Sequence, residues 1–189
     1  MIKKINPLFV LGFILCLGIF LRVYNIPQTL LFHFDQGYHG LAIKDIWDNK
    51  RIALLGHKTD AAGVFHGPAF YYFMLPFYLI SGWNPAGVSI LLAILDGFSI
   101  IFIYFAGKNL FNKNVGLLAA LLYAISYSLI SYSRWLSNVT PIPFFTSAML
   151  YFLVKFSQGK VYFMPLSALI AGFIIQLNGA IGFFFTPLL

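Results

Sequence analysis

The sequence contains no glutamate, and charged residues make up only 9% of its 189 residues. Hydrophobic residues make up 60%, and the mean hydropathy is +0.86. A soluble domain of this size cannot bury so much apolar surface, so a soluble globular protein is excluded and lipid is the expected solvent. We therefore expect an all-α polytopic membrane protein: one transmembrane helix bundle formed by residues 1–189.

Cysteine and the common catalytic motifs are nearly absent as well. The single Cys16 lies inside an apolar run, so it cannot form an internal disulfide, and we interpret it as a packing residue. No glycine-rich phosphate loop, paired-histidine metal motif or nucleophile elbow is present, which gives soluble nucleotide chemistry no support. The sequence identifies no cofactor and no metal ligands. A divalent cation remains an open alternative.

The basic residues, which give a net charge of +7, are scattered beside apolar segments. This pattern is typical of membrane anchoring and does not indicate a nucleic-acid partner. Lys3 and Lys4 precede the first apolar run, and Arg22 lies at its far end. No small-residue cleavage site follows this run. We expect an uncleaved first span and a multi-pass protein of a bacterial or archaeal plasma membrane.

Five apolar stretches are expected to cross the bilayer, and a sixth begins near Ala180. The five are Pro7–Leu21, Ala86–Ala106, Val115–Ile130, Pro141–Phe156 and Val161–Leu177. Residues 67–82 are apolar too, but they are short and contain two prolines. If they do not cross, Lys108, Lys113 and Lys160 fall on the cytoplasmic side with the N-terminus, as the positive-inside bias favours. Residues 24–83 then form an extracytoplasmic loop with interfacial helices.

Within this loop, QGYHGLAIKDIWDNK has the apolar spacing of an interfacial amphipathic helix, with Tyr38, Ala42, Ile43, Ile46 and Trp47 on one face. Asp35 falls where an N-cap is expected, and capping is the simpler interpretation of its carboxylate. The alternative is a general base at the lipid–water boundary, which needs only a substrate hydroxyl within hydrogen-bond reach.

Other polar residues each have a structural and a functional interpretation. His66 either precedes a helix that starts at Pro68 or donates to a phosphate oxygen, with Tyr71 shaping the pocket. Arg134 either extends to the interface beside Trp135 or binds a phosphate. Asp96, near the middle of an apolar span, either acts in function or pairs with a neighbouring helix.

The ordered set LRVYNIP, FDQGYHGLAIKDIWDNKR, FHGPAFYYF and GKNLFNKNVGLLAALLYAISYSLISYSRW resembles the polytopic C-type-fold glycosyltransferases. This group includes protein O-mannosyltransferases and the lipid A aminoarabinose transferase. The resemblance covers essentially the whole chain, but only the N-terminal portion of such transferases.

The resemblance implies that a sugar passes, with inversion, from a polyprenyl phosphate to an acceptor hydroxyl of a protein, lipid or glycan on the extracytoplasmic face. It assigns the base to Asp35 and phosphate contacts to Arg134 and His66, with Gln36 where relatives commonly carry a second acidic residue. The remaining expected substrate-binding residues are Tyr38, Tyr71 and Asn138. The rival interpretations are a transporter or lipid flippase, to which Asp96 and the Pro-broken segment would belong, and a non-catalytic membrane scaffold.

Overall fold

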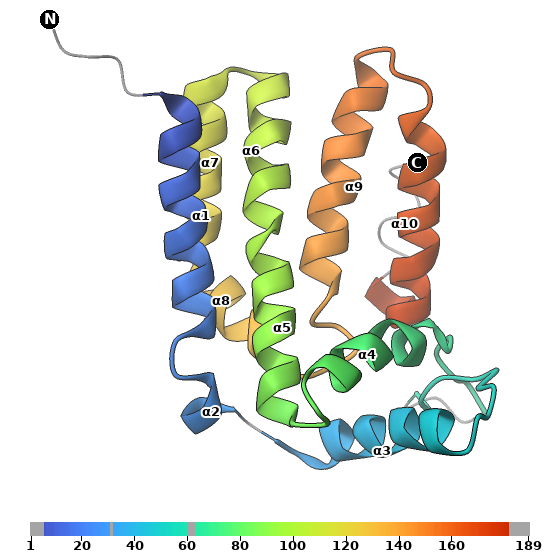
Figure 1. Cartoon of the computed structure of the whole chain (residues 1–189). Helices are drawn as coiled ribbons and strands as arrows, with labels where there is room; N and C mark the ends of the chain where they lie inside the picture. Colours follow the sequence, from blue (N-terminus) through green and yellow to red (C-terminus); the bar gives the residue numbers. More distant parts are fainter. Residues whose placement is uncertain (1–5, 31, 60–62, 182–189) are drawn as a thin grey trace, which may run out of the picture.

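The computed structural model describes residues 6–30, 32–59 and 63–181, and every element assigned in those ranges is a helix. The long helices run side by side as a bundle (Figure 1). They are α1 (Pro7–Val23), α5 (Pro85–Gly97), α6 (Ser99–Leu110), α7 (Lys113–Ile125), α9 (Ile142–Ser157) and α10 (Phe163–Leu177). The sequence therefore predicted the fold class correctly as all-α.

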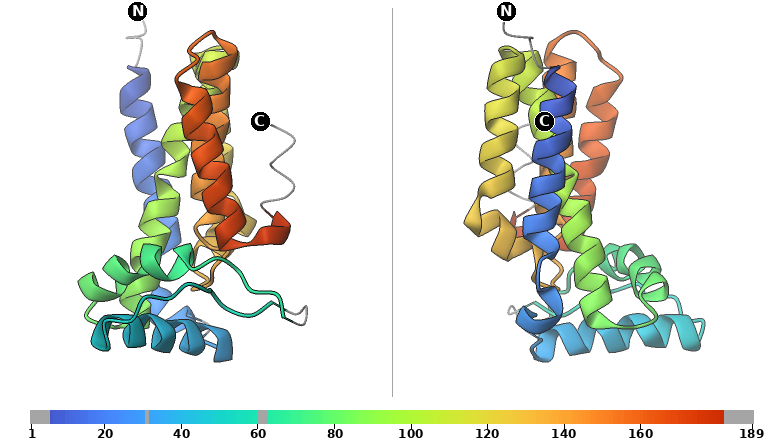
Figure 2. Two further views of the ribbon diagram at one scale, coloured as in Figure 1. Left: turned by 90° about the vertical axis from the view of Figure 1, so that its right-hand side faces the viewer. Right: turned by 60° about the vertical axis from the view of Figure 1, so that its left-hand side comes forward.

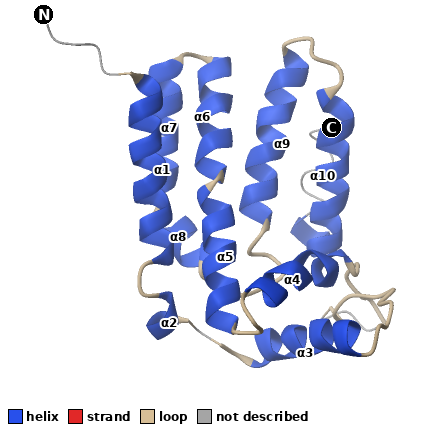
Figure 3. Cartoon of the chain, viewed as in Figure 1, coloured by secondary structure: helices blue, strands red, loops and turns tan. Residues whose placement is uncertain are grey.

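The other helices gather at one end of this bundle (Figure 3). They are α2 (Ile26–Thr29), α3 (Phe34–Asp48), α4 (Ala69–Ile80) and α8 (Tyr127–Ser133). Helices α3 and α4 lie across the end of the bundle and not along it, in each of the views in Figure 2. The α6–α7 and α9–α10 turns lie at the opposite end, where α1 begins.

Asparagine residues start several bundle helices. The Oδ1 of Asn6 accepts a hydrogen bond from the backbone N–H of Leu8 at 3.0 Å, and Pro7 follows as the first helical residue. Asn84 caps α5 in the same way, with its Oδ1 3.0 Å from the N–H of Ala86. These side chains satisfy donors that have no partner within the helix, and a proline at the first position loses nothing.

The expected span Ala86–Ala106 is found as two helices, α5 and α6, that meet at Phe98. Together they form Pro85–Leu110, a helix of 26 residues that is long and apolar enough to cross a membrane. The expected span Val115–Ile130 bends by 58° between α7 and α8. Helices α1, α4, α9 and α10 are shorter apolar helices, and most of the sixth expected span lies outside the described residues.

Close backbone packing joins α6 to α7. A Cβ atom at Gly116 would meet the carbonyl oxygen of Tyr104 at 2.6 Å and the backbone nitrogen of Lys108 at 2.9 Å. No side chain larger than hydrogen fits there, so glycine sets how near the two helices approach. Small residues at such contacts are typical of helix packing in membrane proteins.

A buried polar network holds α1, α5 and α7 together. The Nε of Arg22 lies 2.7 Å from the Oδ2 of Asp96, and the hydroxyl of Tyr123 donates to the Oδ1 of Asp96 at 2.9 Å. Arg22 also donates from Nη1 to the carbonyl oxygens of Gly18 and Ala124, each at 3.1 Å. Of the two interpretations of Asp96, the structure shows the contact between neighbouring helices. Arg22, expected at the end of a span, is fully buried.

Candidate active site

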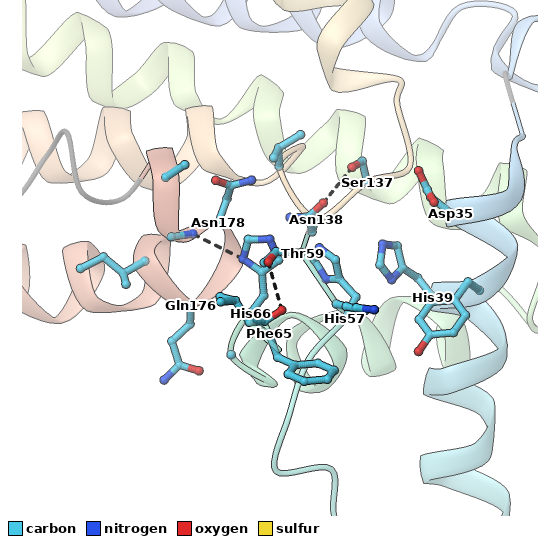
Figure 4. Close-up of a pocket in the computed structure, with 18 of the residues that line it drawn as sticks. Asp35, His39, His57, Thr59, Phe65, His66, Ser137, Asn138, Gln176 and Asn178 are labelled. Atoms are coloured by element: carbon cyan, nitrogen blue, oxygen red, sulfur yellow. Dashed lines mark hydrogen bonds between the residues drawn. The ribbon is translucent and has the colours of Figure 1, made fainter. Parts of the chain in front are cut away.

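A cavity of about 1100 Å³ lies at the end of the bundle that carries α3 and α4. Four separate parts of the chain line it: the first turns of α3, residues 57–59 with 64–67, residues 135–139, and the end of α10 with residues 178–180. Figure 4 shows their side chains converging. The cavity thus gathers polar residues that are far apart in the sequence.

Asp35 lies in the first turn of α3, where its side chain is exposed at the cavity. The prediction that Asp35 is the N-cap was wrong, because the helix begins two residues earlier than expected, with His33 as its N-cap. The carboxylate still benefits from the positive end of the helix dipole. Since it does not cap the helix, it is available to a substrate.

Gln36 makes the capping contact instead. Its Oε1 accepts a hydrogen bond from the backbone N–H of His33 at 2.8 Å, and the side chain is buried. Gln36 is not among the described residues that line the cavity, whereas the neighbouring Tyr38 is. The contacts of Gln36 are those of a helix start, and a substrate contact by it stays a prediction.

The predicted amphipathic character of α3 holds in part. Ile43 is fully buried in a core that includes Met74 and Tyr78 of α4. Tyr38 and Trp47, expected on the same face, keep 49% and 40% of their surface exposed. Tyr38 is exposed because it stands at the cavity, which the apolar spacing could not reveal.

His66 and His57 are paired by a short antiparallel contact between the segments 56–59 and 63–66. The backbone N–H of Gly56 donates to the carbonyl of His66 at 2.9 Å, and that of His66 donates to the carbonyl of His57 at 3.0 Å. An isolated bridge between Lys58 and Phe65 continues the contact. The imidazole rings of His57 and His66 consequently lie 4.2 Å apart, centroid to centroid.

His39 extends this pair into a row of three histidines, with its ring centroid 4.7 Å from that of His57. We call His39, His57 and His66 the histidine row. All three line the cavity. The row was not predicted: His39 lies one helical turn after Asp35, which is a usable signal, but the position of His57 depends on pairing that its sequence neighbourhood does not reveal.

Burial keeps the histidine row uncharged at neutral pH. Desolvation lowers the pKa of His39 to about 4, against an opposing effect of Asp35. Desolvation, with smaller effects of His39 and His66, lowers the pKa of His57 to about 4, and burial also lowers the pKa of His66. A neutral imidazole carries one N–H and one acceptor nitrogen.

The hydrogen bonds of His66 indicate which nitrogen carries its proton. Its Nδ1 accepts from the backbone N–H of Gly179 at 3.4 Å, so in the neutral ring the proton is on Nε2. His66 is thereby held with an N–H donor free for a ligand oxygen. The predicted donation from His66 to a phosphate oxygen stays a prediction.

Tyr71, on α4, is buried, and its ring centroid lies 6.1 Å from that of His39. Burial, with a smaller effect of Tyr38, raises the pKa of Tyr71 to about 12, so its hydroxyl stays protonated. Tyr71 does not appear among the described lining residues. It contacts His39 of the histidine row, and direct contact between Tyr71 and a substrate remains a prediction.

Asn138 and Arg134 lie in and beside the segment that follows α8. Asn138 lines the cavity, but its Nδ2 donates to the carbonyl of Leu177 at 2.7 Å and its Oδ1 accepts from Ser137 at 3.1 Å. Arg134 donates from Nη2 to the carbonyl of Leu21 at 2.6 Å, and its Nε has no partner among the described residues. Trp135 lines the cavity, whereas Arg134 does not.

No group of three or more histidine, cysteine, aspartate or glutamate side chains is arranged to hold a metal ion in the described part of the chain. Asp35 supplies a carboxylate, His66 supplies an N–H donor, and Tyr38 and Trp135 supply aromatic surface.

An apolar helical bundle with a polar, carboxylate-containing cavity at one end has the layout of a membrane enzyme that works where lipid meets water. The sequence model of the dolichyl-phosphate-mannose-protein mannosyltransferase family matches residues 65–189, and the chain belongs to this family. The resemblance seen in the sequence is thereby confirmed. The family consists of membrane-embedded glycosyltransferases of the mannosyltransferase type. A search of curated proteins gives no match.

The matched range divides the candidate site. His66, Arg134 and Asn138 lie within it, and Asp35, His39 and His57 precede it. The structure places residues from both parts around one cavity.

Proposed function

We propose that the chain transfers a sugar from a polyprenyl-phosphate donor to an acceptor hydroxyl, with inversion, and that Asp35 is the base. The acceptor belongs to a protein, a lipid or a glycan. The observation that carries the proposal is that Asp35 and His66, whose Nδ1 accepts a hydrogen bond and whose proton is therefore on Nε2, line the same cavity. A base and a donor on one substrate site are what transfer from a phosphate leaving group requires.

In this reaction the acceptor oxygen forms a bond to the anomeric carbon while the bond from that carbon to the phosphate oxygen breaks. Asp35 takes the proton of the acceptor hydroxyl. The electrons of the broken bond stay with the phosphate, and His66 donates a hydrogen bond to it. Attack from the face opposite the leaving group inverts the anomeric centre. The role of Arg134 as a further phosphate contact is proposed from the family resemblance.

A second cavity suits the lipid part of the donor. It has a volume of about 360 Å³ and is lined mainly by apolar residues of α6, α8 and α9, among them Ile103, Leu129 and Ile142. Ala180 lines the first cavity and the next residue, Ile181, lines the second. A phosphate in the polar cavity could therefore extend its isoprenoid chain into the apolar one.

The proposal includes a multi-pass arrangement in the membrane. At 1.5 Å per residue, helices of 15–17 residues such as α1, α9 and α10 measure about 23–26 Å, which flanking side chains and local thinning can accommodate. Lys108, Lys113 and Lys160 lie at the end where α1 begins. The positive-inside rule assigns that end to the cytoplasm and the cavity to the extracytoplasmic face of a bacterial or archaeal plasma membrane.

The transporter alternative gains no support from Asp96. This carboxylate is enclosed by Arg22 and Tyr123 and lines neither described cavity. A flippase would move the lipid-linked sugar without breaking the sugar–phosphate bond. Release of polyprenyl phosphate from the donor thus distinguishes the enzyme from the transporter.

The test uses the protein in lipid nanodiscs with a radiolabelled polyprenyl-phosphate hexose and measures released polyprenyl phosphate. Asp35→Asn should reduce release by about 10²–10⁴-fold, because a positioned general base contributes that much. Asp48→Asn is the matched control: this carboxylate lies on the same helix in an exposed pair with Lys44, 2.9 Å away. Near-normal turnover in Asp35→Asn would remove Asp35 from the mechanism.

A further inference from the structure

The histidine row contains two ring nitrogens with no use in the fold. His39 is 95% buried, and its Nδ1 has no hydrogen-bond partner among the described residues; the same holds for the buried Nδ1 of His57. A buried polar atom without a partner costs about 1–3 kcal/mol. His39 and His57 both line the cavity, so a ligand there lies against the rings that carry these two atoms.

The rings are also close enough for the charge of one protonated ring to act on its neighbours. The ring centroids of His57 lie 4.7 Å from His39 and 4.2 Å from His66. A proton on any one ring disfavours a proton on its neighbours, because like charges at this separation repel. The row can therefore hold one extra proton, and that proton adds both a positive charge and a second N–H donor to one ring.

We propose that the histidine row binds the phosphate group of the donor lipid and takes up one proton as it does so. The inference rests on the proposed function and extends it, because it assigns phosphate binding to His39 and His57 as well as His66. A bound anion favours the protonated ring in the same way that a neighbouring carboxylate does. Without a ligand, the neutral row places no buried charge at the cavity. With phosphate bound, the negative charge of the phosphate balances the positive charge of the protonated ring.

The surrounding charges permit this behaviour. Asp35, from α3, favours a proton on His39, whereas His66 opposes it, and Lys58 also lines the cavity. Tyr38 and Tyr71 are the phenols nearest the row. The other two segments face the cavity with uncharged polar groups, namely Ser137, Asn138, Gln176 and Asn178. Arg134, beside them, directs its Nη2 to the carbonyl of Leu21.

A phosphodiester donor makes the test unambiguous. Its single phosphate charge does not change between pH 5 and 8, so any proton taken up on binding comes to the protein. Binding of a polyprenyl-phosphate hexose to the chain in nanodiscs is measured by titration calorimetry at pH 6, in two buffers that differ in ionisation enthalpy. We expect uptake of up to one proton. The affinity should fall by up to tenfold per pH unit between pH 5 and 7, as linkage requires.

His57→Gln keeps a hydrogen-bonding side chain but cannot titrate, so it should abolish most of the uptake and flatten the pH dependence. His39→Gln is a second, independent variant, and thermal unfolding verifies that each one folds. The matched control is His33→Asn, which replaces the exposed histidine at the α3 N-cap with a good capping residue and should bind like the wild type.

Each outcome of these measurements supports or overturns the proposed role of the histidine row. Donor binding without proton uptake, or uptake that persists in both glutamine variants, overturns the role of the row. If the wild type binds the donor and releases polyprenyl phosphate with no proton uptake, only this inference fails and the proposed function stands. If the wild type neither binds nor converts the donor, both fail.

Discussion

Arg22 and Asp96 form an ion pair of 2.7 Å inside the bundle, with both side chains almost completely buried. The pair links the end of α1 to the end of α5, and Tyr123 adds α7 to the same contact. In a low-dielectric interior either charge alone would be strongly unfavourable. The pair therefore fixes which helices are neighbours and at what register.

Removing one partner of this pair should destabilise the protein far more than removing both. We expect Arg22→Met or Asp96→Leu to lower the free energy of unfolding by about 3–5 kcal/mol, and the double variant to recover most of the loss. Denaturant unfolding in mild detergent measures this. The control is the exposed pair of Lys44 and Asp48, whose loss should change the stability by less than about 1 kcal/mol. Additive losses at Arg22 and Asp96 would contradict the interpretation.

Acidification should destabilise the ligand-free protein through its histidine row. Folding lowers the pKa of His39 from 6.5 to about 4, so the unfolded chain binds more protons between these values. Stability is then fully present above about pH 6.5 and declines as the pH falls toward 4. Thermal unfolding between pH 4 and 8 should show a shallower decline for His39→Gln than for the wild type. Parallel curves would show that His39 does not titrate in this window.

Gly56 should be needed for the pairing of His57 with His66. A Cβ atom at Gly56 would overlap with the carbonyl oxygen of Gly67 and press on that of His66. We expect Gly56→Ala to separate the paired segments and reduce sugar transfer by at least about tenfold, as misplaced substrate groups do. Gly172→Ala is the control, since its Cβ has open space within α10 and should leave transfer unchanged. Full activity in Gly56→Ala would show that the pairing is dispensable.

The orientation in the membrane is tested by cysteine labelling after Cys16 is replaced. A cysteine at Lys108 should resist an impermeant thiol reagent added from outside, because that end of the bundle is assigned to the cytoplasm. A cysteine at Ile52, which is 81% exposed in the loop after α3, should react readily. Labelling of the Lys108 position and protection of the Ile52 position would invert the proposed topology.

The sequence predicted the helices well because their apolar runs are local signals. It located their breaks less well. The joint at Phe98 and the 58° bend between α7 and α8 fall inside continuous apolar stretches, where packing against neighbours determines the backbone. Asp35 was misplaced by two positions because His33 and Gln36 together make the helix start.

Residues of the candidate site could be predicted only where their neighbours in the sequence gave a signal. Asp35 and His66 were identified from their sequence surroundings, and the structure places both at the cavity. His57 was missed because its relation to His66 depends on the pairing of the segments 56–59 and 63–66. The ion pair of Arg22 was missed because its partner is on another helix. Such long-range contacts are set by the tertiary fold, which local patterns do not specify.

The two cavities have linings of different chemistry, one with Asp35 and His66 and the other mainly apolar, which has a use in inhibitor design. A compound that joins a non-hydrolysable phosphonate to a short branched hydrocarbon would address both compartments at once. Its two halves need no shared chemistry, and a series of linker lengths would find the one that reaches from one compartment to the other. Varying the hydrocarbon alone would then measure how deeply the apolar compartment accepts a tail.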